Sequence, residues 1–383
     1  MAEIRLRNLT KRFGDVRAVS DLTLDAASGE LVALLGPSGC GKTTTLRMVA
    51  GFETPTAGRI LLGDRDVTET PPERRNCGMV FQHYALFPHL TVAQNVAFGL
   101  EMRQAPRAEI GRRVSAILER VGLAGLDARF PRQLSGGQQQ RTALARALVI
   151  NPSVLLLDEP LANLDAKLRE EMRFYIRSLQ REFGITTLYV THDQAEALVL
   201  ADRVAVLMDG VLRQFDPPEE IYHHPRSAAV AAFIGLTNLL PGRVASRAGD
   251  ALVVETPAGQ VRGRGVPELT PGRPAMLSVR PEHIDLDGGG AGPPGGGDGI
   301  NRLRGVVVER TFLGAVTDFR VDVGDGLILR VQGRAAASHR TGERVALAFP
   351  EGAAWAVPPG DGPAGVGEAS GPRGPQPGPA GAG

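Results

Sequence analysis

Residues 36–43, GPSGCGKT, constrain the fold of this chain more than any other segment. They fit the pattern G-x-x-x-x-G-K-[ST], follow the apolar run LVALLG at 31–36 and precede the helical pattern TTTLRMVAGF. A strand, a glycine-rich turn and a helix in this order point backbone N–H groups at an anion, and the helix N-terminus adds its positive end. The segment therefore predicts an α/β fold with a phosphate-binding loop between a buried strand and a helix.

Three side chains of this loop have different expected uses. Lys42 can reach the β- and γ-phosphates of a nucleotide, and the Thr43 hydroxyl can be a ligand of Mg²⁺, which prefers oxygen. For Cys40 we expect the backbone N–H to matter more than the thiol. The alternative, a chance glycine turn before a helix, does not explain the complete strand–loop–helix context.

A second segment, VLLLDEP at 154–160, ends an apolar strand pattern with two carboxylates. Ligands of open α/β sheets bind at the carboxyl ends of the strands, and neighbouring strand residues point in opposite directions. We therefore expect Asp158 to belong to the magnesium shell and Glu159 to be the general base that polarises the attacking water. A solvated acidic pair at a strand end is the alternative.

Further strand and helix patterns extend the α/β prediction. The run TTLYVT at 186–191 is another buried strand followed by a helix pattern, and 204–216 reads as a hairpin turning at Asp209-Gly210. His192 follows the strand 186–191, which we expect to lie parallel to the strand that carries Glu159. This placement favours a role for His192 at the phosphates over a merely structural histidine.

Composition excludes several classes of protein. The net charge is +1, which gives no basic field for nucleic acid. No apolar run approaches the ~18 residues of a membrane span, and the N-terminus lacks the apolar core of a signal peptide. Two cysteines, Cys40 and Cys77, provide neither a disulfide framework nor a four-ligand zinc site. We expect a reducing cytoplasm and no transmembrane segment.

The chain divides into regions of different pattern. We predict an α/β domain over 1–237 and a small all-β domain over 238–356, where short strand patterns alternate with glycine-containing turns. Glycine and proline dominate 288–299 and the end of the chain. These stretches predict a flexible loop at 288–299 and a disordered tail at 357–383.

The order of motifs identifies a resemblance. LSGGQ at 134–138 precedes VLLLDEP, and Gln82, LANLD at 161–165 and VTHDQ around His192 occur at matching places. With VRPEHIDL at 279–286, the chain resembles the ATP-binding subunits of ABC-type importers that carry a C-terminal TOBE-like domain. The resemblance covers about residues 3 to 355 and implies an ABC ATPase domain followed by paired OB-like barrels.

The resemblance implies roles for individual residues. Phe13 would stack on adenine, where the family usually has tyrosine, and Gln82 would touch both the magnesium and the attacking water. His192 would contact the γ-phosphate. The phosphate cradle would comprise Ser38, Gly39, Cys40, Gly41, Lys42, Thr43 and Thr44. Signature residues Ser135, Gly137 and Gln138 would contact ATP across a head-to-tail dimer, and Asp165 would join the two sites. Ala162 replaces a frequent serine of the family, which leaves the coupling between the sites in doubt.

Partners also follow from the resemblance. We expect ATP and Mg²⁺ as cofactors and a homodimer that closes around two ATP molecules, an arrangement with C₂ symmetry. Two membrane permease subunits would dock near residues 83–100, with Leu90 and Val96 packing inward, and an extracellular solute-binding protein would take part indirectly. The chain would lie at the cytoplasmic face of the membrane and bind no nucleic acid.

Several functions remain open at this point. The amino-acid sequences of 220–242 and 180–198 most resemble those of importers of polyamines, ferric iron or phosphonates, and sugar importers are the alternative. A soluble ABC ATPase acting on ribosomes or DNA is a competing class, although it usually has tandem nucleotide domains. A third hypothesis is a regulatory module in which the barrel domain senses solute.

Overall fold

The computed structural model describes residues 2–287, 299–334 and 339–359, and they form two units. The first unit comprises residues 1–226 and 230–236, and the second comprises residues 227–229 and 237–383. The flexible loop expected at 288–299 lies outside the described residues except for Gly299, whose carbonyl accepts a hydrogen bond from the Glu351 amide at 2.9 Å. The tail expected at 357–383 lies outside them except for 357–359.

A six-stranded sheet forms the centre of the first unit, in the order β10-β9-β3-β8-β7-β6. All neighbouring pairs are parallel except β9 with β10. Its strands are β3 (Leu31–Leu35), β6 (Cys77–Val80), β7 (Val154–Asp158), β8 (Thr186–Thr191), β9 (Arg203–Met208) and β10 (Val211–Asp216). Every residue of β3, β7 and β8 is buried, as expected of strands that are covered on both faces. The predicted strands at 154–158 and 186–191 and the hairpin at 204–216 are confirmed.

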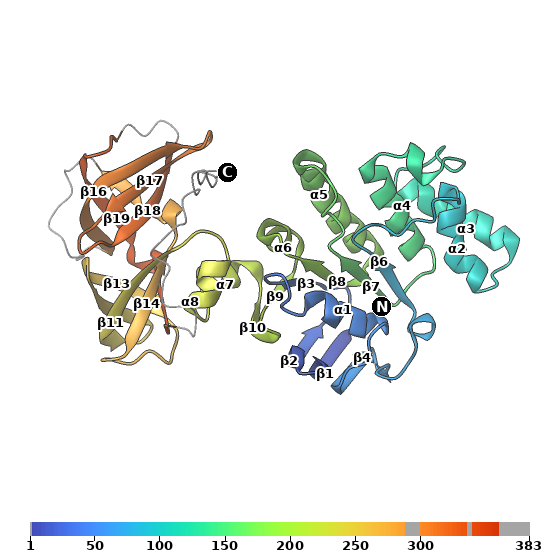
Figure 1. Ribbon diagram of the computed structural model, residues 1–383, viewed down its shortest axis with the longest axis horizontal. Helices are drawn as coiled ribbons and strands as arrows, with labels where there is room; N and C mark the ends of the chain where they lie inside the picture. The colour runs from blue at the N-terminus through green and yellow to red at the C-terminus, as the bar shows by residue number, and fades with distance from the viewer. Residues whose placement is uncertain (1, 288–298, 335–338, 360–383) are drawn as a thin grey trace, which may run out of the picture. The chain divides into compact units, whose positions relative to one another are not determined.

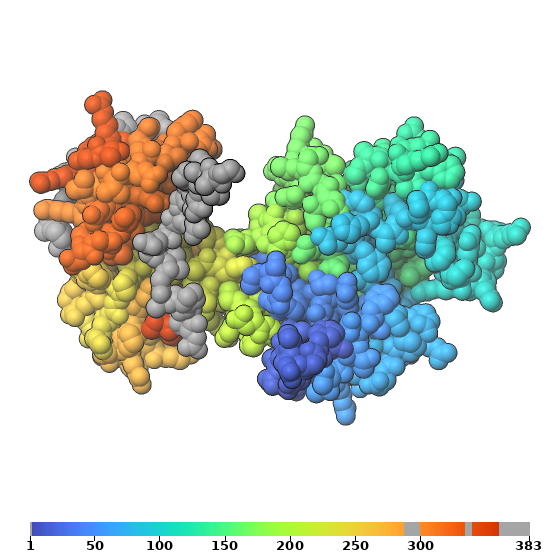
Figure 2. Space-filling model, in the orientation of Figure 1, coloured from blue at the N-terminus to red at the C-terminus, as the bar shows by residue number. Residues whose placement is uncertain are grey.

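A four-stranded antiparallel sheet lies beside this centre, in the order β2-β1-β4-β5. Its strands are β1 (Ile4–Phe13), β2 (Val16–Ala26), β4 (Ala57–Leu62) and β5 (Arg65–Asp66). Leu6, Leu22 and Leu24 point inward and form one core with residues of β3 and β7. Most outward residues of these strands are polar, with Phe13 and Val16 as exposed apolar exceptions, and Figure 2 shows the dark-blue atoms of β1 and β2 at the surface of the unit. This alternation is typical of an antiparallel sheet with one solvated face.

Helices cover the central sheet. They are α1 (Lys42–Ala50), α2 (Val92–Met102), α3 (Arg107–Arg120), α4 (Gly136–Leu148), α5 (Ala166–Phe183), α6 (Gln194–Leu200), α7 (Pro218–His223) and α8 (Ala228–Phe233). Figure 1 shows α2, α3 and α4 gathered beyond β6, and the buried side chains of these three helices belong to one hydrophobic cluster with β7 and α5. Helix α1 belongs to the other cluster, against β1 and β2. The phosphate-loop helix and the helix that follows LSGGQ therefore rest on separate cores.

The second unit is all-β. A closed barrel has the order β11-β12-β13-β20-β14, and a five-stranded sheet has the order β15-β19-β16-β17-β18. The barrel strands are β11 (Asn238–Ala248), β12 (Ala251–Thr256), β13 (Gly259–Gly265), β14 (Pro274–Val279) and β20 (Ala354–Val357). The sheet strands are β15 (Asp285–Asp287), β16 (Ile300–Phe312), β17 (Val316–Asp322), β18 (Ile328–Arg334) and β19 (Arg344–Pro350). One apolar core, which includes Leu277, Phe319 and Val357, serves both sheets.

Two details of the second unit differ from the expectation. Strand β20 includes Val357, which is fully buried, so it contains the first residue of the expected tail. The second of the expected paired barrels is an open five-stranded sheet within the described residues. The sequence of strand β13, GQVRGRG, is rich in glycine and arginine and contains no apolar run.

Candidate active site

The loop 36–43 joins β3 to α1, as its sequence predicts. Gly39 and Gly41 have φ of 80° and 96°, a region that favours glycine. A Cβ on Gly41 would lie 2.3 Å from the carbonyl oxygen of Ala18, so no other residue fits at this position. Helix α1 has no side-chain cap at its N-terminus. The first N–H groups of α1 are therefore available to an anion, and the cradle fits a nucleotide phosphate.

The Lys42 ammonium lies inside this loop. It donates hydrogen bonds to the carbonyl oxygens of Gly36 at 2.7 Å and Pro37 at 2.9 Å. Its side chain is buried, and no carboxylate forms an ion pair with it in the described residues. The Cys40 thiol lies 3.7 Å from the ammonium, and burial raises the pKa of this thiol. Burial of a thiol in this way disfavours the nucleophilic thiolate, and the minor role of the Cys40 thiol stays a prediction.

The residues assigned to Mg²⁺ are only partly brought together. Thr43 Oγ1 donates to Asp158 Oδ1 at 3.2 Å, which joins the start of α1 to the end of β7. Burial raises the pKa of Asp158, and the hydrogen bond from Thr43 opposes that shift. A hydroxyl and a carboxylate at this spacing fit a magnesium shell. The side chain of Gln82 is exposed and makes no hydrogen bond among the described residues, so its place in this shell remains a prediction.

Glu159 and His192 meet at the ends of two neighbouring strands. The register pairs Asp158 with Val190 across β7 and β8, so Glu159 follows the end of one strand and His192 follows the end of the other. His192 Nδ1 lies 3.0 Å from Glu159 Oε2. Glu159 has a φ of 44°, which is uncommon for a residue with a side chain, and its amide donates to the Val190 carbonyl at 3.0 Å. Strained backbone of this kind is frequent at functional sites.

The LSGGQ segment begins α4 with a capping box. Ser135 Oγ accepts from the Gln138 amide at 3.3 Å, and Gln138 Oε1 accepts from the Ser135 amide at 3.0 Å. A Cβ on Gly137 would lie 3.2 Å from Leu168 Cδ1, so this glycine packs closely against α5. No hydrogen bond or ion pair joins Ser135, Gly137 or Gln138 to the phosphate loop anywhere in the described ranges. Within one chain, the signature segment and the phosphate loop are therefore separate from each other.

Asp165 and Phe13 lie at other edges of the unit. Asp165 is the N-cap of α5 and accepts from the Leu168 amide at 3.0 Å. Phe13 ends β1 and is 47% exposed, and the Lys11 ammonium lies 4.7 Å from its ring centroid. An exposed ring of this kind can stack on a base, as expected of Phe13.

The segment 83–91 has an unusual backbone that three side chains support. Tyr84 and Ala85 have φ of 60° and 48°. The Arg146 guanidinium of α4 donates to the carbonyl oxygens of both residues at 2.7 Å. Asn163 donates to the Gln82 carbonyl at 2.6 Å, and the amide of Asn95 donates to the carbonyls of Phe87, Leu90 and Thr91. The roles of Arg146 and Asn163 could not be predicted from local sequence, because their contacts join distant parts of the chain.

Other expectations for this segment have mixed outcomes. Val96 is buried, as expected, whereas Leu90 is only half-buried. His83 is exposed, and its Nδ1 is 3.1 Å from Asn163 Nδ2. His224 Nδ1 lies 2.8 Å from Glu220 Oε2, one turn away on α7.

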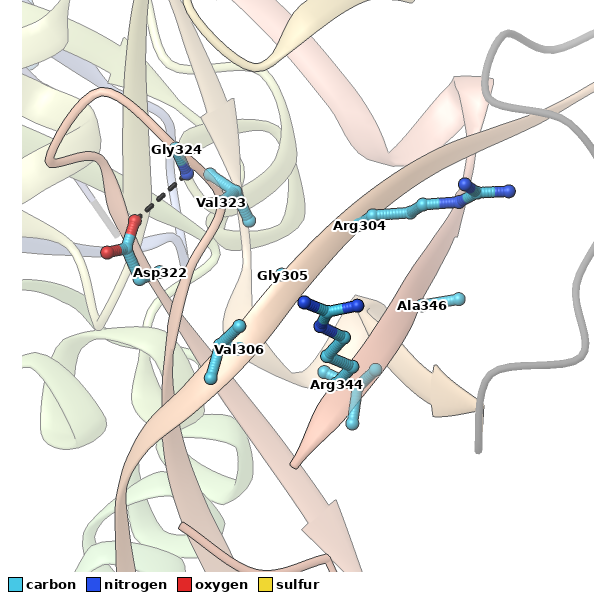
Figure 3. Close-up of a pocket in the computed structure, with 9 residues that line it drawn as sticks. Arg304, Gly305, Val306, Asp322, Val323, Gly324, Arg344 and Ala346 are labelled. Carbon is cyan, nitrogen blue, oxygen red and sulfur yellow. Dashed lines mark hydrogen bonds between the residues drawn. The ribbon is translucent and has the colours of Figure 1, made fainter. Parts of the chain in front are cut away.

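A hollow of about 610 Å³ lies away from all of these residues, on the five-stranded sheet of the second unit. Strands β16, β17 and β19 form it, and Figure 3 shows Arg304, Val306, Asp322 and Arg344 along its lining. None of the predicted site residues lines this hollow.

In the described ranges, none of the helices has the length and apolar character of a membrane span.

Comparison with known proteins agrees with this geometry. Residues 19–162 match the family model described as ABC transporter, and residues 277–357 match the TOBE domain. The spermidine/putrescine import ATP-binding protein PotA of Acidothermus cellulolyticus is 51% identical over 338 residues, which cover 86% of each chain. The Fe(3+) ions import ATP-binding protein FbpC 1 of Rhizobium meliloti is 46% identical and covers 90% of this chain and 95% of its own.

A solved structure shows a similar fold. It is the dimeric post-hydrolysis state of the ATP-binding cassette MJ0796 bound to ADP and Pi, with a TM-score of 0.51 and 32% sequence identity. The likeness covers 56% of this chain and 98% of that one. The α/β unit of this chain therefore has the fold of a nucleotide-binding cassette.

Proposed function

Since the chain belongs to the family of ATP-binding subunits of ABC importers, we propose that two copies of it hydrolyse ATP together to drive the uptake of a polyamine. The chain is an ATPase and the motor subunit of an importer. The assignment of individual residues, the dimer and the solute are the proposed parts. The observation that carries the residue assignment is the pair Glu159 and His192, which lies beside the pair Thr43 and Asp158.

The proposed reaction starts with ATP on the phosphate loop. The N–H groups of 38–44 surround the phosphates, and the Lys42 ammonium exchanges its two carbonyl partners for β- and γ-phosphate oxygens. Mg²⁺, held by Thr43 and Asp158, would neutralise charge on those oxygens. Glu159 accepts the proton of the attacking water, and the bond from the γ-phosphorus to the bridging oxygen breaks to give ADP and phosphate. His192 fixes the Glu159 carboxylate through the 3.0 Å contact.

The dimer completes the site in this proposal. Within one chain, the signature residues Ser135, Gly137 and Gln138 make no polar contact with their own phosphate loop. A second copy in a head-to-tail arrangement would place its signature on the γ-phosphate, and the same contact would recur at the other site. Asp165 starts α5 next to the signature glycines and would carry changes between the two sites. The dimeric cassette similar to this chain supports the arrangement.

Membrane subunits would dock on the segment 83–100. Asn163 donates a hydrogen bond to the Gln82 carbonyl just before this segment, and Arg146 donates to the carbonyls of Tyr84 and Ala85 within it. A displacement of the segment would therefore be transmitted to the 161–165 loop and to the signature helix α4. The half-buried Leu86, Phe87 and Leu90 would offer apolar surface to an amphipathic helix of the membrane subunit. The chain would then lie on the cytoplasmic face of the membrane, with the solute-binding protein on the other side.

The solute is proposed from the relatives. Several of them, from different bacteria, are named as spermidine/putrescine import proteins, and one is named for Fe(3+) ions. Polyamine is therefore the first choice, with ferric iron the second. A phosphonate ranks below both solutes, because only the resemblance of the sequence segments 180–198 and 220–242 suggests it.

Uptake in cells tests the proposal. A strain that lacks this gene is compared with the parent for uptake of labelled spermidine, ferric iron, a phosphonate and maltose. We expect a loss of spermidine uptake that the wild-type chain restores and the Glu159→Gln chain does not. Loss of iron uptake instead would change the solute, and unaltered uptake of all four would refute the proposed solute classes.

A further inference from the structure

The turn that carries His192 rests on a buried carboxylate that the proposed mechanism does not use. Glu196 belongs to α6, and 4% of its surface is exposed. Its Oε2 accepts hydrogen bonds from Tyr189 Oη at 2.8 Å and from Thr191 Oγ1 at 2.7 Å. Burial of a carboxylate costs free energy unless hydrogen bonds compensate for the lost water. Both compensating bonds come from β8, the strand that leads to His192.

A second set of bonds fixes the other side of the turn. The Asp193 amide donates to Thr191 Oγ1 at 2.9 Å, so this hydroxyl joins the residues on either side of His192. Asp193 Oδ1 accepts from the Glu196 amide at 3.1 Å. Asp193 Oδ2 accepts from Arg173 Nη2 of α5 at 3.0 Å. The backbone of residue 192 therefore has little freedom, although its side chain is 60% exposed.

We propose that Glu196 is a positioning residue that holds His192 against Glu159. Thr191 transmits the effect, because its hydroxyl donates to Glu196 and accepts from the residue after His192. The inference rests on the role proposed above for His192. A purely structural use of Glu196 is the competing explanation. That use would stabilise the fold without acting through the imidazole.

The surroundings of Glu196 support a positioning role. The groups that face it are Tyr189 and Thr191 of β8, Asp193 of the turn and, farther out, Arg173 of α5. The side-chain cap of α6 is Asp193, which accepts from the Glu196 amide, and the Glu196 carboxylate makes no bond to the helix start. Of the two bonds that this carboxylate accepts, the one from Thr191 holds the path of the chain toward residue 192.

A double-mutant cycle tests the inference on the purified full-length chain. Glu196→Ala is made in the wild type and in His192→Ala, and kcat and KM for ATP are measured. We expect kcat to fall by roughly 10- to 100-fold in the wild type, because a small misplacement of a catalytic contact has effects of this order. In His192→Ala, the same change should alter kcat by less than about twofold, because residues that act through one contact are not additive.

Two further variants separate positioning from folding. Glu196→Gln keeps an oxygen that can accept both hydroxyl bonds, so kcat should return to within about threefold of the wild type. Tyr189→Phe removes one bond to the same oxygen but leaves the turn intact, so kcat should stay unchanged. If Glu196→Ala does not fold, Thr191→Val has the same shape as threonine and should give the same fall in kcat.

The outcomes distinguish this inference from the proposed function. Equal losses in both backgrounds, or wild-type kcat in Glu196→Ala, overturn the positioning role alone. Wild-type kcat in His192→Ala overturns the role proposed for His192 and the inference with it. Loss of kcat confined to the background that has His192, with rescue by glutamine, supports both.

Discussion

His192 Nδ1 lies 3.0 Å from Glu159 Oε2, at the ends of two adjacent parallel strands. A general base must be able to accept a proton, so in the proposed mechanism His192 Nδ1 is the donor of this hydrogen bond and Glu159 Oε2 is the acceptor. The imidazole therefore orients the carboxylate that we propose as general base. The backbone of Glu159 is left-handed, with a φ of 44°, and its amide donates to the Val190 carbonyl of the neighbouring strand.

Glu159→Gln tests the base directly. We expect ATP to bind normally and turnover to fall by roughly 10²- to 10⁴-fold, the usual cost of losing a general base. The variant should accumulate as an ATP-bound dimer, visible by size-exclusion chromatography with and without ATP. Glu182→Gln changes a carboxylate that pairs with Arg120 at the surface and should leave turnover unchanged. A wild-type rate in Glu159→Gln would exclude the assignment.

Lys42→Ala should weaken the binding of ATP. The variant loses charge-assisted hydrogen bonds to the phosphates, each worth about 1.5–3 kcal/mol, so the Kd should rise by roughly 10- to 150-fold. Calorimetry with ATP measures the change. AMP, which has no β- or γ-phosphate, is the control ligand and should bind both chains alike. An unchanged Kd for ATP would contradict the role of Lys42.

Stability should depend on pH through Glu196. Burial raises the pKa of this carboxyl, whereas the bonds from Thr191 and Tyr189 and the charge of Arg173 lower it and Asp193 raises it. The unfolded chain therefore releases the proton at lower pH than the folded chain, and stability falls as pH rises from the ordinary glutamate pKa through the folded one. Glutamine does not titrate. The stability gained by Glu196→Gln relative to wild type should thus grow with pH and then level off.

Urea unfolding of both chains between pH 4.5 and 8 measures this difference. Other titrating groups, such as Asp158, are present in both chains and largely cancel. A difference that stays constant across this range would show that the pKa of Glu196 is the same in the folded and unfolded chains.

Arg146→Ala should loosen the turn at Tyr84 and Ala85. Two carbonyl oxygens lose their donors there, and we expect the free energy of unfolding to fall by about 1 kcal/mol. Hydrogen exchange of the amides at 84–88 should become faster. Arg120→Ala, which removes a surface ion pair with Glu182, serves as the control and should leave exchange at 84–88 unchanged. Unaltered exchange in Arg146→Ala would show that the other contacts suffice.

Truncation separates the end of the second unit from the residues that follow it. A chain that ends at Pro359 should keep ATPase activity and stability, because 360–383 consist mostly of glycine, proline and alanine. A chain that ends at Ala353 loses β20, including the fully buried Ala354, Ala356 and Val357. We expect the second unit of that shorter chain to unfold at lower temperature by calorimetry. Equal melting of the two chains would contradict the structural role of β20.

Local sequence carried most of the prediction of the fold. The strands at 154–158 and 186–191 and the phosphate loop have signals within a few residues, either continuous apolar runs or a fixed glycine spacing. Strand β13 could not be found in this way. A Cβ on its Gly263 would lie 2.5 Å from the carbonyl oxygen of Ala354. Glycine is therefore required by close contact with β20, a strand that is distant in sequence.

The residues of the candidate site also fall into two groups, those with a local sequence signal and those without one. Thr43, Asp158, Glu159 and His192 follow buried strands or the glycine loop, and topology brings their ends together. The supporting residues Asn163, Arg146 and Glu196 are polar residues without a distinctive local pattern. Their importance depends on which backbone or side-chain atoms lie opposite them, and that information appears only in three dimensions.

The position of β20 has a consequence for synthesis of the chain. This strand lies between β13 and β14 in the barrel, yet β14 ends at Val279 and β20 begins only at Ala354. A nascent chain on the ribosome therefore holds an open barrel, with the edges of β13 and β14 unpaired, until residues 354–357 emerge. The strands of the five-stranded sheet are translated in between, so the barrel closes late. Until it closes, the unpaired edges of β13 and β14 are available to a chaperone.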